Sequence, residues 1–293
     1  MKTEINRILI AFLLGTVCVH AQMPDTDIFI GELSWENGTP AVKSPVNMTK
    51  KAGYDNQPCF HKDGKSFFFT AIHQDTTQSD IYYCDLEKRT IGKFTKTPVS
   101  EYSPQLSPDG SLLGVVRVDA DSGQRFYTIP VEEPRMAFHH EGSDSIGYFT
   151  FLTDTTIAMF ILGEQGSLQI LELPSGQRKK ICASIGRCMK TDKERKNLYF
   201  MDKTVEPIIM RMDVYTSAFE SVAKPISGSE DFEILKDGSI IMGSDGKLFR
   251  LEKDAVDWVL IADLSASVGQ FYRIAVDADN KRIAFVAYSG KRP

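Results

Sequence analysis

The sequence is poor in the residues and motifs that most often mark an enzyme. Its 293 residues include 5 His, 5 Cys and 2 Trp. It holds no Gly-x-Ser-x-Gly turn for a nucleophilic serine, no His-Glu-x-x-His zinc pair and no complete Gly-x-x-x-x-Gly-Lys-Ser/Thr phosphate loop. These absences exclude the commonest hydrolase, metalloprotease and nucleotide-binding signatures, although catalytic residues can still be collected from separate segments.

Positive charge is also scarce. The chain carries 34 Lys and Arg against 39 Asp and Glu, a formal net charge of −5, and no basic stripe. Because nucleic-acid-binding surfaces are basic, we expect no nucleic-acid partner. A content of 42% hydrophobic and 25% charged residues is typical of a globular protein and excludes wholesale disorder.

A long apolar run occurs only at the N-terminus. Two basic residues precede the run Ile8–Val19, and small or apolar residues stand at the positions that a signal peptidase reads. This pattern predicts a signal peptide over residues 1–21, cut after Ala21, and export to the periplasm or beyond the cell. Lipidation of Cys18 and an uncleaved membrane anchor are the alternatives. No later segment is long and apolar enough to predict a membrane span.

Four cysteines follow the predicted signal: Cys59, Cys84, Cys182 and Cys188. Export would permit disulfides, and Cys182 and Cys188 are close enough in sequence for a bridge. The strand assignments below place the cysteines within strands, where small apolar side chains pack. Single buried thiols are therefore the favoured interpretation.

Self-similarity is the most informative feature of the chain. Residues 57–64 and 103–110 share a proline at the second place, a large apolar residue at the fourth and a final Asp-Gly, and an apolar run follows each. Partial copies lie at 147–155, 187–196, 231–238 and 273–280. The turns fall near residues 64, 110, 155, 196, 238 and 280, about 41 to 46 residues apart, which indicates a regular array.

Each repeat has the same interior: an apolar run, an Asp-Gly-type turn, a second run, a polar loop and two further strands. Four short antiparallel strands in a unit of this length are typical of a propeller blade. The last unit shows only Phe271–Val276 and Arg282–Tyr288, so Asp27–Leu33 and Pro40–Met48 are the candidates for its outer strands. We predict an all-β fold, a six-bladed β-propeller of four-stranded antiparallel blades, with the ring closed by N-terminal strands that join the last blade.

The motif Ser-Pro-x-apolar-Ser-Pro-Asp-Gly resembles the PD40, or WD40-like, repeat of TolB-type six-bladed propellers. Residues 103–110 match it closely, and residues 57–64 match it with Gln57, His61 and Lys62 in place of the two serines and the second proline. The resemblance implies one TolB-like propeller domain over residues 22–293. It also implies an exported bacterial protein that serves as an interaction platform, with no room for a separate hydrolase domain.

Three local patterns are candidate chemical sites. His139-His140-Glu141 contains metal-ligand types but is predicted to lie in a solvated loop between blades. Asp119–Gly123 and Asp277–Asn280 resemble calcium-loop spacing, yet the same residues suit tight turns. Cys59 and His61 alternate on the first strand and could form a nucleophilic pair, although no oxyanion donors are evident.

The strongest candidate site is defined by position. The first strand of each blade lies nearest the axis, so residues at its start should border one mouth of the central channel. By the repeat alignment these are Asn56, Gln57, Tyr102, Ser103, Arg187, Asp231, Tyr272 and Arg273. Their mixture of aromatic, amide and charged groups suits a peptide, a sugar or a protein loop. The alternative is that they only connect neighbouring blades.

The sequence thus predicts an exported, non-catalytic propeller that binds a protein or peptide partner in the cell envelope, without a cofactor or metal. We expect the chain to be monomeric. A propeller-type enzyme with its site in the channel, such as a lactonase, lyase or cyclotransferase, is the second hypothesis. A carbohydrate-binding propeller is the third.

Overall fold

The computed structural model describes residues 23–73 and 77–290, and within these ranges every regular element is a β-strand. The predicted signal peptide and its cleavage site lie outside the described residues. Among the described residues no helix could cross a lipid bilayer. The prediction of an all-β fold is confirmed.

Four separate sheets each contain four antiparallel strands that pair in chain order, as the repeat predicts. The first comprises β7 (Ser100–Leu106), β8 (Leu112–Val118), β9 (Gln124–Pro130) and β10 (Phe138–His139), and the second β11 (Ile146–Thr153), β12 (Thr156–Ile161), β13 (Ser167–Glu172) and β14 (Gln177–Ala183). The third comprises β15 (Ile185–Thr191), β16 (Asn197–Asp202), β17 (Ile208–Asp213) and β18 (Phe219–Ala223), and the fourth β19 (Phe232–Ile234), β20 (Ile240–Ser244), β21 (Lys247–Leu251) and β22 (Val259–Asp263).

The remaining sheet has eight strands and joins the two ends of the chain. Its members are β23 (Phe271–Val276), β24 (Arg282–Tyr288), β1 (Thr26–Glu36), β2 (Thr39–Asn47), β3 (Gly53–Phe60), β4 (Ser66–His73), β5 (Asp80–Asp85) and β6 (Thr90–Lys93). β1 pairs antiparallel with β24 from Thr26–Tyr288 to Glu32–Arg282, and β2 pairs with the other edge of β1. The predicted pairing of N-terminal strands with the last two strands is therefore present, and one parallel pair, Thr26–Tyr54, links them to β3.

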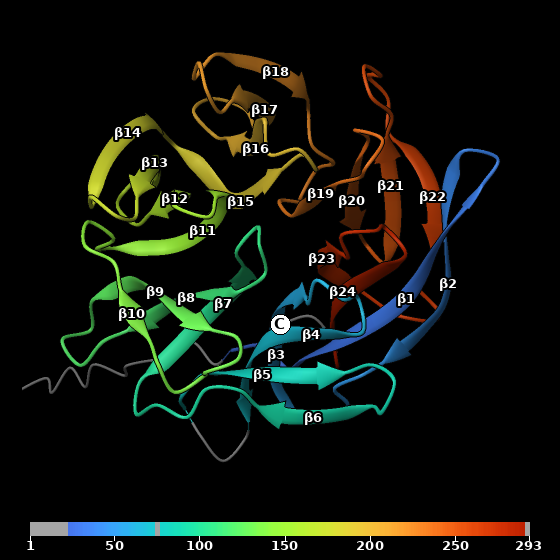
Figure 1. The fold of residues 1–293 in the computed structure, drawn as a ribbon. Coiled ribbons are helices and arrows are strands. Elements are labelled where there is room, and N and C mark those ends of the chain that lie inside the picture. The colour runs from blue at the N-terminus through green and yellow to red at the C-terminus, as the bar shows by residue number, and fades with distance from the viewer. Residues whose placement is uncertain (1–22, 74–76, 291–293) are drawn as a thin grey trace, which may run out of the picture.

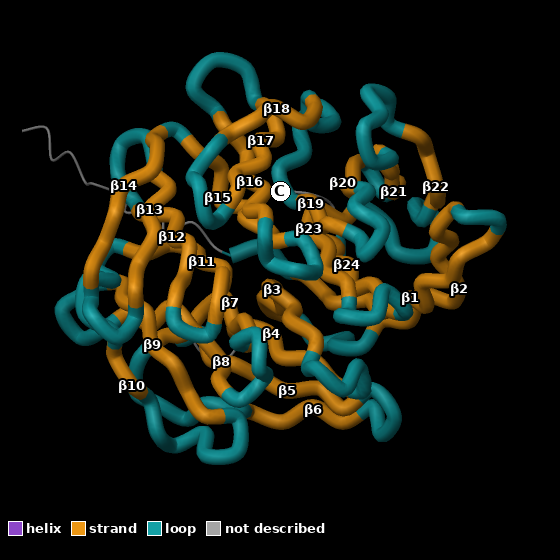
Figure 2. Tube along the Cα trace, turned by 45° about the horizontal axis from the view of Figure 1, so that its top comes forward, coloured by secondary structure: helices purple, strands orange, loops and turns teal. Residues whose placement is uncertain are grey.

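The sheets stand around a common centre. β3 contacts β7, β7 contacts β11, and the contacts continue through β15, β19 and β23 back to β3. Figure 1 shows these strands innermost and β6, β10, β14, β18 and β22 at the periphery. In the tilted view of Figure 2, β1 and β2 lie beside β24, and β2 also contacts β22. The first strand of each repeat therefore faces the centre, where the candidate site is predicted.

The Asp-Gly turns have the same geometry in every strong copy of the repeat. The backbone N–H of Gly64 donates to the carbonyl of His61, and the same bond joins Gly110 to Ser107, Gly238 to Leu235 and Asn280 to Asp277. The donor residue has a positive φ in all four turns, between 53° and 82°, a conformation that glycine and asparagine adopt most readily. This recurrence explains why Asp-Gly marks the repeat.

One short strand differs from the prediction. The sequence predicts a solvated loop at His139, whereas the structure pairs Phe138 and His139 with Thr128 and Tyr127 as the outer strand β10. The loop prediction is wrong because a two-residue strand with exposed side chains shows no alternation of apolar and polar residues.

Glycines on second strands admit aromatic rings from the first strand of the next sheet. A Cβ on Gly243 of β20 would collide with the ring of Phe271 in β23, and one on Gly114 of β8 would lie 2.8 Å from a ring carbon of Phe149 in β11. Phe271 and Phe149 are both buried. The packing of neighbouring sheets therefore depends on a missing side chain at these positions.

We expect Gly243→Ala to lower the free energy of unfolding by about 1 to 3 kcal/mol, because the added methyl must displace the Phe271 ring. Gly163→Ala is the matched control, since a Cβ at this glycine would meet no atom within 4 Å. Urea denaturation of both variants tests this. Equal stability of the two variants would contradict the packing argument.

Candidate functional site

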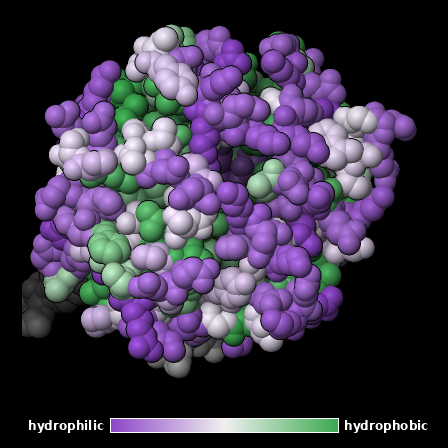
Figure 3. All heavy atoms as spheres, viewed as in Figure 1, coloured by the Kyte–Doolittle hydropathy of each residue, from purple (hydrophilic) through white to green (hydrophobic). Residues whose placement is uncertain are grey.

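A cavity of about 500 Å³ occupies the centre of the fold, within the size range of ligand sites. Its lining comes from the first strands β3, β7, β11, β15, β19 and β23 and from the turns that follow them. Figure 3 shows hydrophilic residues gathered around a hollow near the centre of the molecule. The centre of the fold is therefore hollow, and its lining mixes polar and charged residues with apolar ones such as Pro58, Leu106 and Ile274.

Seven of the eight residues predicted at the channel mouth form one connected hydrogen-bond network. The Gln57 side chain donates to Ser103 Oγ at 2.9 Å and accepts from the Ser103 backbone N–H at 2.8 Å. Asn56 Oδ1 accepts from the Gln57 backbone N–H and from Arg273 Nη1, and Asn56 Nδ2 donates to the Tyr272 hydroxyl. The network thus joins β3 to β7 and to β23.

Asp231 is the acidic centre of this network. Its Oδ2 accepts from Arg187 Nη2 at 2.9 Å and from Arg273 Nε at 3.3 Å, and its side chain is 7% exposed. Burial opposes ionisation, but the charges of Arg273 and Arg187 outweigh it and hold the pKa of Asp231 below its ordinary value. The carboxylate therefore stays charged and links β15, β19 and β23.

The predicted residues do not all face the cavity. In the adjacent pairs Asn56–Gln57, Tyr102–Ser103 and Tyr272–Arg273, only the second residue lines it, together with Arg187 and Asp231. The strand register shifts at each of these pairs, and Gln57 and Ser103 have a positive φ, so the backbone is irregular where the second residue enters the cavity. Tyr102 lies outside the network and packs beside the core cluster that contains Phe126 and Phe149.

Sequence reasoning missed a second charged pair in the cavity. Lys190 Nζ donates to Glu233 Oε1, and both residues line the cavity. Burial raises the pKa of Glu233, while Glu233 keeps the pKa of Lys190 above its ordinary value despite burial. Glu233 lies two residues beyond Asp231, so the two-residue period of a strand was the available signal for Glu233, whereas Lys190 lies three residues beyond Arg187 and gave no such signal.

Cys59 and His61 both line the cavity but turn to separate partners. Cys59 Sγ lies 3.8 Å from the Phe60 carbonyl oxygen, and His61 Nδ1 lies 3.1 Å from Asp63 Oδ1. Burial raises the pKa of the Cys59 thiol to about 11, which keeps the thiolate scarce at neutral pH. This environment disfavours the nucleophilic pair.

The four cysteines of the described chain are free thiols. Cys84 and Cys188 are buried, and Cys59 and Cys182 are partly buried. Cys182 lies in β14 and Cys188 in the next strand, β15. The structure therefore agrees with the interpretation of single thiols rather than a bridge between Cys182 and Cys188.

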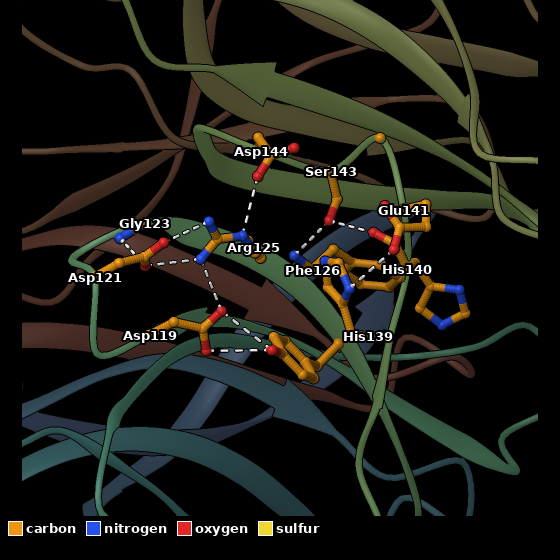
Figure 4. A network of polar contacts seen from close by, with 12 residues as sticks. Asp119, Asp121, Gly123, Arg125, Phe126, His139, His140, Glu141, Ser143 and Asp144 are labelled. Carbon is orange, nitrogen blue, oxygen red and sulfur yellow. Dashed lines mark hydrogen bonds and ion pairs between the residues drawn. The ribbon is translucent and has the colours of Figure 1, made fainter.

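The aspartates of the calcium-like loop Asp119–Gly123 are bound by an arginine. Arg125 donates to Asp119, to both oxygens of Asp121 and to Asp144, with distances of 2.8 to 3.0 Å (Figure 4). The backbone N–H of Ser122 donates to the Asp119 carbonyl, which is a tight turn. The turn interpretation is therefore confirmed at this loop.

The His139-His140-Glu141 side chains also have separate partners. His140 Nε2 lies 2.9 Å from Thr128 Oγ1 and its ring packs against Phe126, whereas His139 Nδ1 is 3.9 Å from the exposed Glu141 carboxylate. In residues 23–73 and 77–290 no three His, Cys, Asp or Glu side chains are grouped as metal ligands.

Comparison with known proteins shows the fold. No protein-family model and no curated protein sequence matches the chain. Among solved structures, a protein described as a putative TolB from Agrobacterium tumefaciens is 13% identical with a TM-score of 0.70, covering 91% of this chain and 99% of that one. A gluconolactonase from Xanthomonas campestris is 8% identical with a TM-score of 0.62, covering 91% and 97%.

An oligogalacturonate lyase solved with manganese is 12% identical with a TM-score of 0.53, covering 92% of this chain and 99% of that one. The chain therefore has a TolB-like β-propeller fold. Because this fold is shared by proteins of different activity, the function must be argued from the site.

Proposed function

We propose that the chain is an exported β-propeller that binds a protein or peptide segment through its central cavity without catalysing a reaction. The proposal includes a signal peptide over residues 1–21 and one domain over 22–293. It also includes six blades in a ring that β1 and β2 close by completing the blade of β23 and β24. The cyclic contacts among the six first strands support this arrangement.

The chemistry of the cavity lining is the main support for the binding role. The central cavity is lined by amide, hydroxyl and charged groups, and its carboxylates Asp231 and Glu233 are bound by Arg187, Arg273 and Lys190. Such groups can exchange hydrogen bonds with a peptide backbone and polar side chains. Carboxylates held in ion pairs are less available as general bases, which favours binding over catalysis.

A photo-crosslinking experiment tests the proposal. Ala278 is exposed and lines the cavity, so a photoreactive phenylalanine analogue placed there should crosslink a partner in the native cell envelope. The same analogue at Val205, which is 91% exposed and does not line the cavity, is the matched control. We expect a specific adduct from position 278 and none from position 205.

Two outcomes would overturn the proposal. Identical adducts from both positions would show that the partner does not use the cavity. Turnover of lactones or oligogalacturonates by the purified chain, lost on substitution of residues that line the cavity, would make the chain an enzyme instead.

A further inference from the structure

The cavity is positively charged within an acidic protein. Its lining includes seven Lys or Arg residues and four Asp or Glu residues, a formal surplus of three positive charges, whereas the whole chain carries −5. The seven are Lys62, Arg187, Lys190, Lys193, Arg195, Lys236 and Arg273, and the four are Asp192, Asp231, Glu233 and Asp277. A surface excess of the opposite sign to the chain marks a place where an anion is favoured.

The surplus is concentrated at the mouth formed by the turns after the first strands. Lys62 follows β3, Lys193 and Arg195 follow β15, and Lys236 follows β19. Lys62, Lys193 and Lys236 are exposed. We name Lys62, Lys193, Arg195 and Lys236 together the basic mouth. They come from three different sheets.

The two carboxylates at this mouth, Asp192 and Asp277, accept hydrogen bonds from backbone N–H groups of the turns in which they lie. Asp192 Oδ1 accepts from the backbone N–H groups of Lys196 and Asn197. Asp277 Oδ1 accepts from the backbone N–H groups of Lys281 and Arg282. The backbone N–H groups of the turns therefore partly compensate the negative charge of these two carboxylates.

Further carboxylates stand near the rim and are also partnered: Asp154, whose charge acts on Arg195, accepts from the backbone N–H of Asp109 at 3.0 Å. Asp109 accepts from the hydroxyls of Ser107 and Ser111, and Asp279 pairs with Lys281 at 3.0 Å. By contrast, Lys62 and Arg195 donate to carbonyl oxygens: Lys62 Nζ lies 3.2 Å from that of Asp109, and Arg195 Nη1 lies 2.6 Å from that of Phe151. A ligand carboxylate would be a stronger acceptor for both than a neutral carbonyl.

Basic side chains also line the end of the cavity opposite the basic mouth. There Arg187 and Arg273 share Asp231, and Arg187 Nε is buried without a hydrogen-bond partner. The lining runs from Gln57 in β3 to Lys62 in the turn that follows, and from Arg187 in β15 to Arg195 in the turn after that strand, so it connects the two ends of the cavity. A single extended segment could therefore meet basic side chains from one end of the cavity to the other.

The aromatic lining argues for a peptide over a saccharide. Tyr148 lines the cavity, but Arg273 stands over its ring with the guanidinium carbon 5.7 Å from the ring centroid. Phe60 and Phe149 also line it and are 8% and 1% exposed. A sugar ring would find little aromatic surface for stacking, whereas a peptide needs hydrogen-bonding and charged groups.

We propose that the occupant of the cavity is an acidic peptide segment that enters through the basic mouth and places its carboxylates against Lys62, Lys193, Arg195 and Lys236. This inference rests on the proposed binding function and adds the chemistry of the partner. Electrostatic attraction of this kind raises the association rate and weakens with added salt.

Fluorescence anisotropy with labelled decapeptides of alternating Ser and Glu, Ser and Gln, or Ser and Lys tests the proposal. We expect only the Glu peptide to bind, and its dissociation constant to rise at least tenfold in Lys193→Gln/Lys236→Gln. The double variant Lys179→Gln/Lys180→Gln removes the same charge from the exposed strand β14 and should bind as the original chain does.

The outcomes separate this inference from the proposed function. Equal binding of the Gln peptide, abolished when Ala278→Trp fills the cavity, would refute the acidic preference but retain peptide binding. Binding of oligogalacturonate without binding of the Glu peptide would refute a peptide ligand. An equal loss of affinity in both double variants would show that total charge, rather than the basic mouth, is responsible.

Discussion

Replacing Asp231 with Asn is expected to lower the free energy of unfolding by about 3 to 5 kcal/mol, as found when one partner of a buried ion pair is removed. The substitution keeps the shape of the side chain but removes the charge that Arg187 and Arg273 share, and it leaves Arg187 only the carboxylate of Glu230, 3.9 Å from its Nη1. Urea denaturation at pH 7 measures the loss. Because the pKa of Asp231 is held below the ordinary 3.8, the difference from the original chain should shrink as the pH falls below that value.

Asp144→Asn is the matched control for this substitution. Asp144 also accepts a hydrogen bond from an arginine, Arg125, but its side chain is 63% exposed. An exposed pair of this kind contributes less than about 1 kcal/mol. If Asp231→Asn were no more destabilising than Asp144→Asn, the central network would not be a stabilising element of the fold.

The variant Asp55→Asn is expected to gain stability relative to the original chain as the pH rises. Asp231→Asn, by contrast, is expected to lose stability relative to the original chain over its own pH range. Asp55 in β3 is 2% exposed, and burial, with smaller contributions from Asp27 and Asp25, raises its pKa to about 7. The folded chain therefore holds this proton more tightly than the unfolded chain, in which the pKa is near 3.8. Stability from this group is present at low pH and is lost as the pH rises through 7.

Between pH 5 and pH 8 this linkage corresponds to about 2 to 3 kcal/mol of lost stability, which Asn, a neutral replacement, should remove. Urea denaturation at the two pH values gives the difference for each chain. Asp257→Asn, at an exposed position, is expected to leave the difference unchanged. An Asp55→Asn chain that loses as much stability at pH 8 as the original would show that Asp55 ionises freely in the fold.

Much of the fold was predictable because its signals are local. An Asp-Gly turn forces a residue with positive φ between two strands, so Gly64, Gly110 and Gly238 fixed the positions of the strand pairs around them. Strands with one buried face also show a clear alternation. The short outer strand β10 carried neither signal, and its side chains are exposed.

The site was predictable in position but not in its interactions. The repeat alignment brought Asn56 and Tyr272 to the same mouth, yet their hydrogen bond joins residues 216 positions apart and depends on how the sheets are placed. The basic mouth was overlooked for another reason. Lys193 and Lys236 lie in turns, where a lysine normally indicates only solvent exposure, and their shared location appears only when three sheets meet.

The pairing of β1 with β24 has a consequence for how the chain is made. Thr26 and Tyr288 are about 260 residues apart in sequence, so one of the first strands to be synthesised finds its partner only when the last has emerged. Contacts of such high sequence separation carry a large loop-closure cost and slow folding. Until then the edge of β1 that pairs with β24 is open, and an open strand edge is a place where another chain can add by strand pairing.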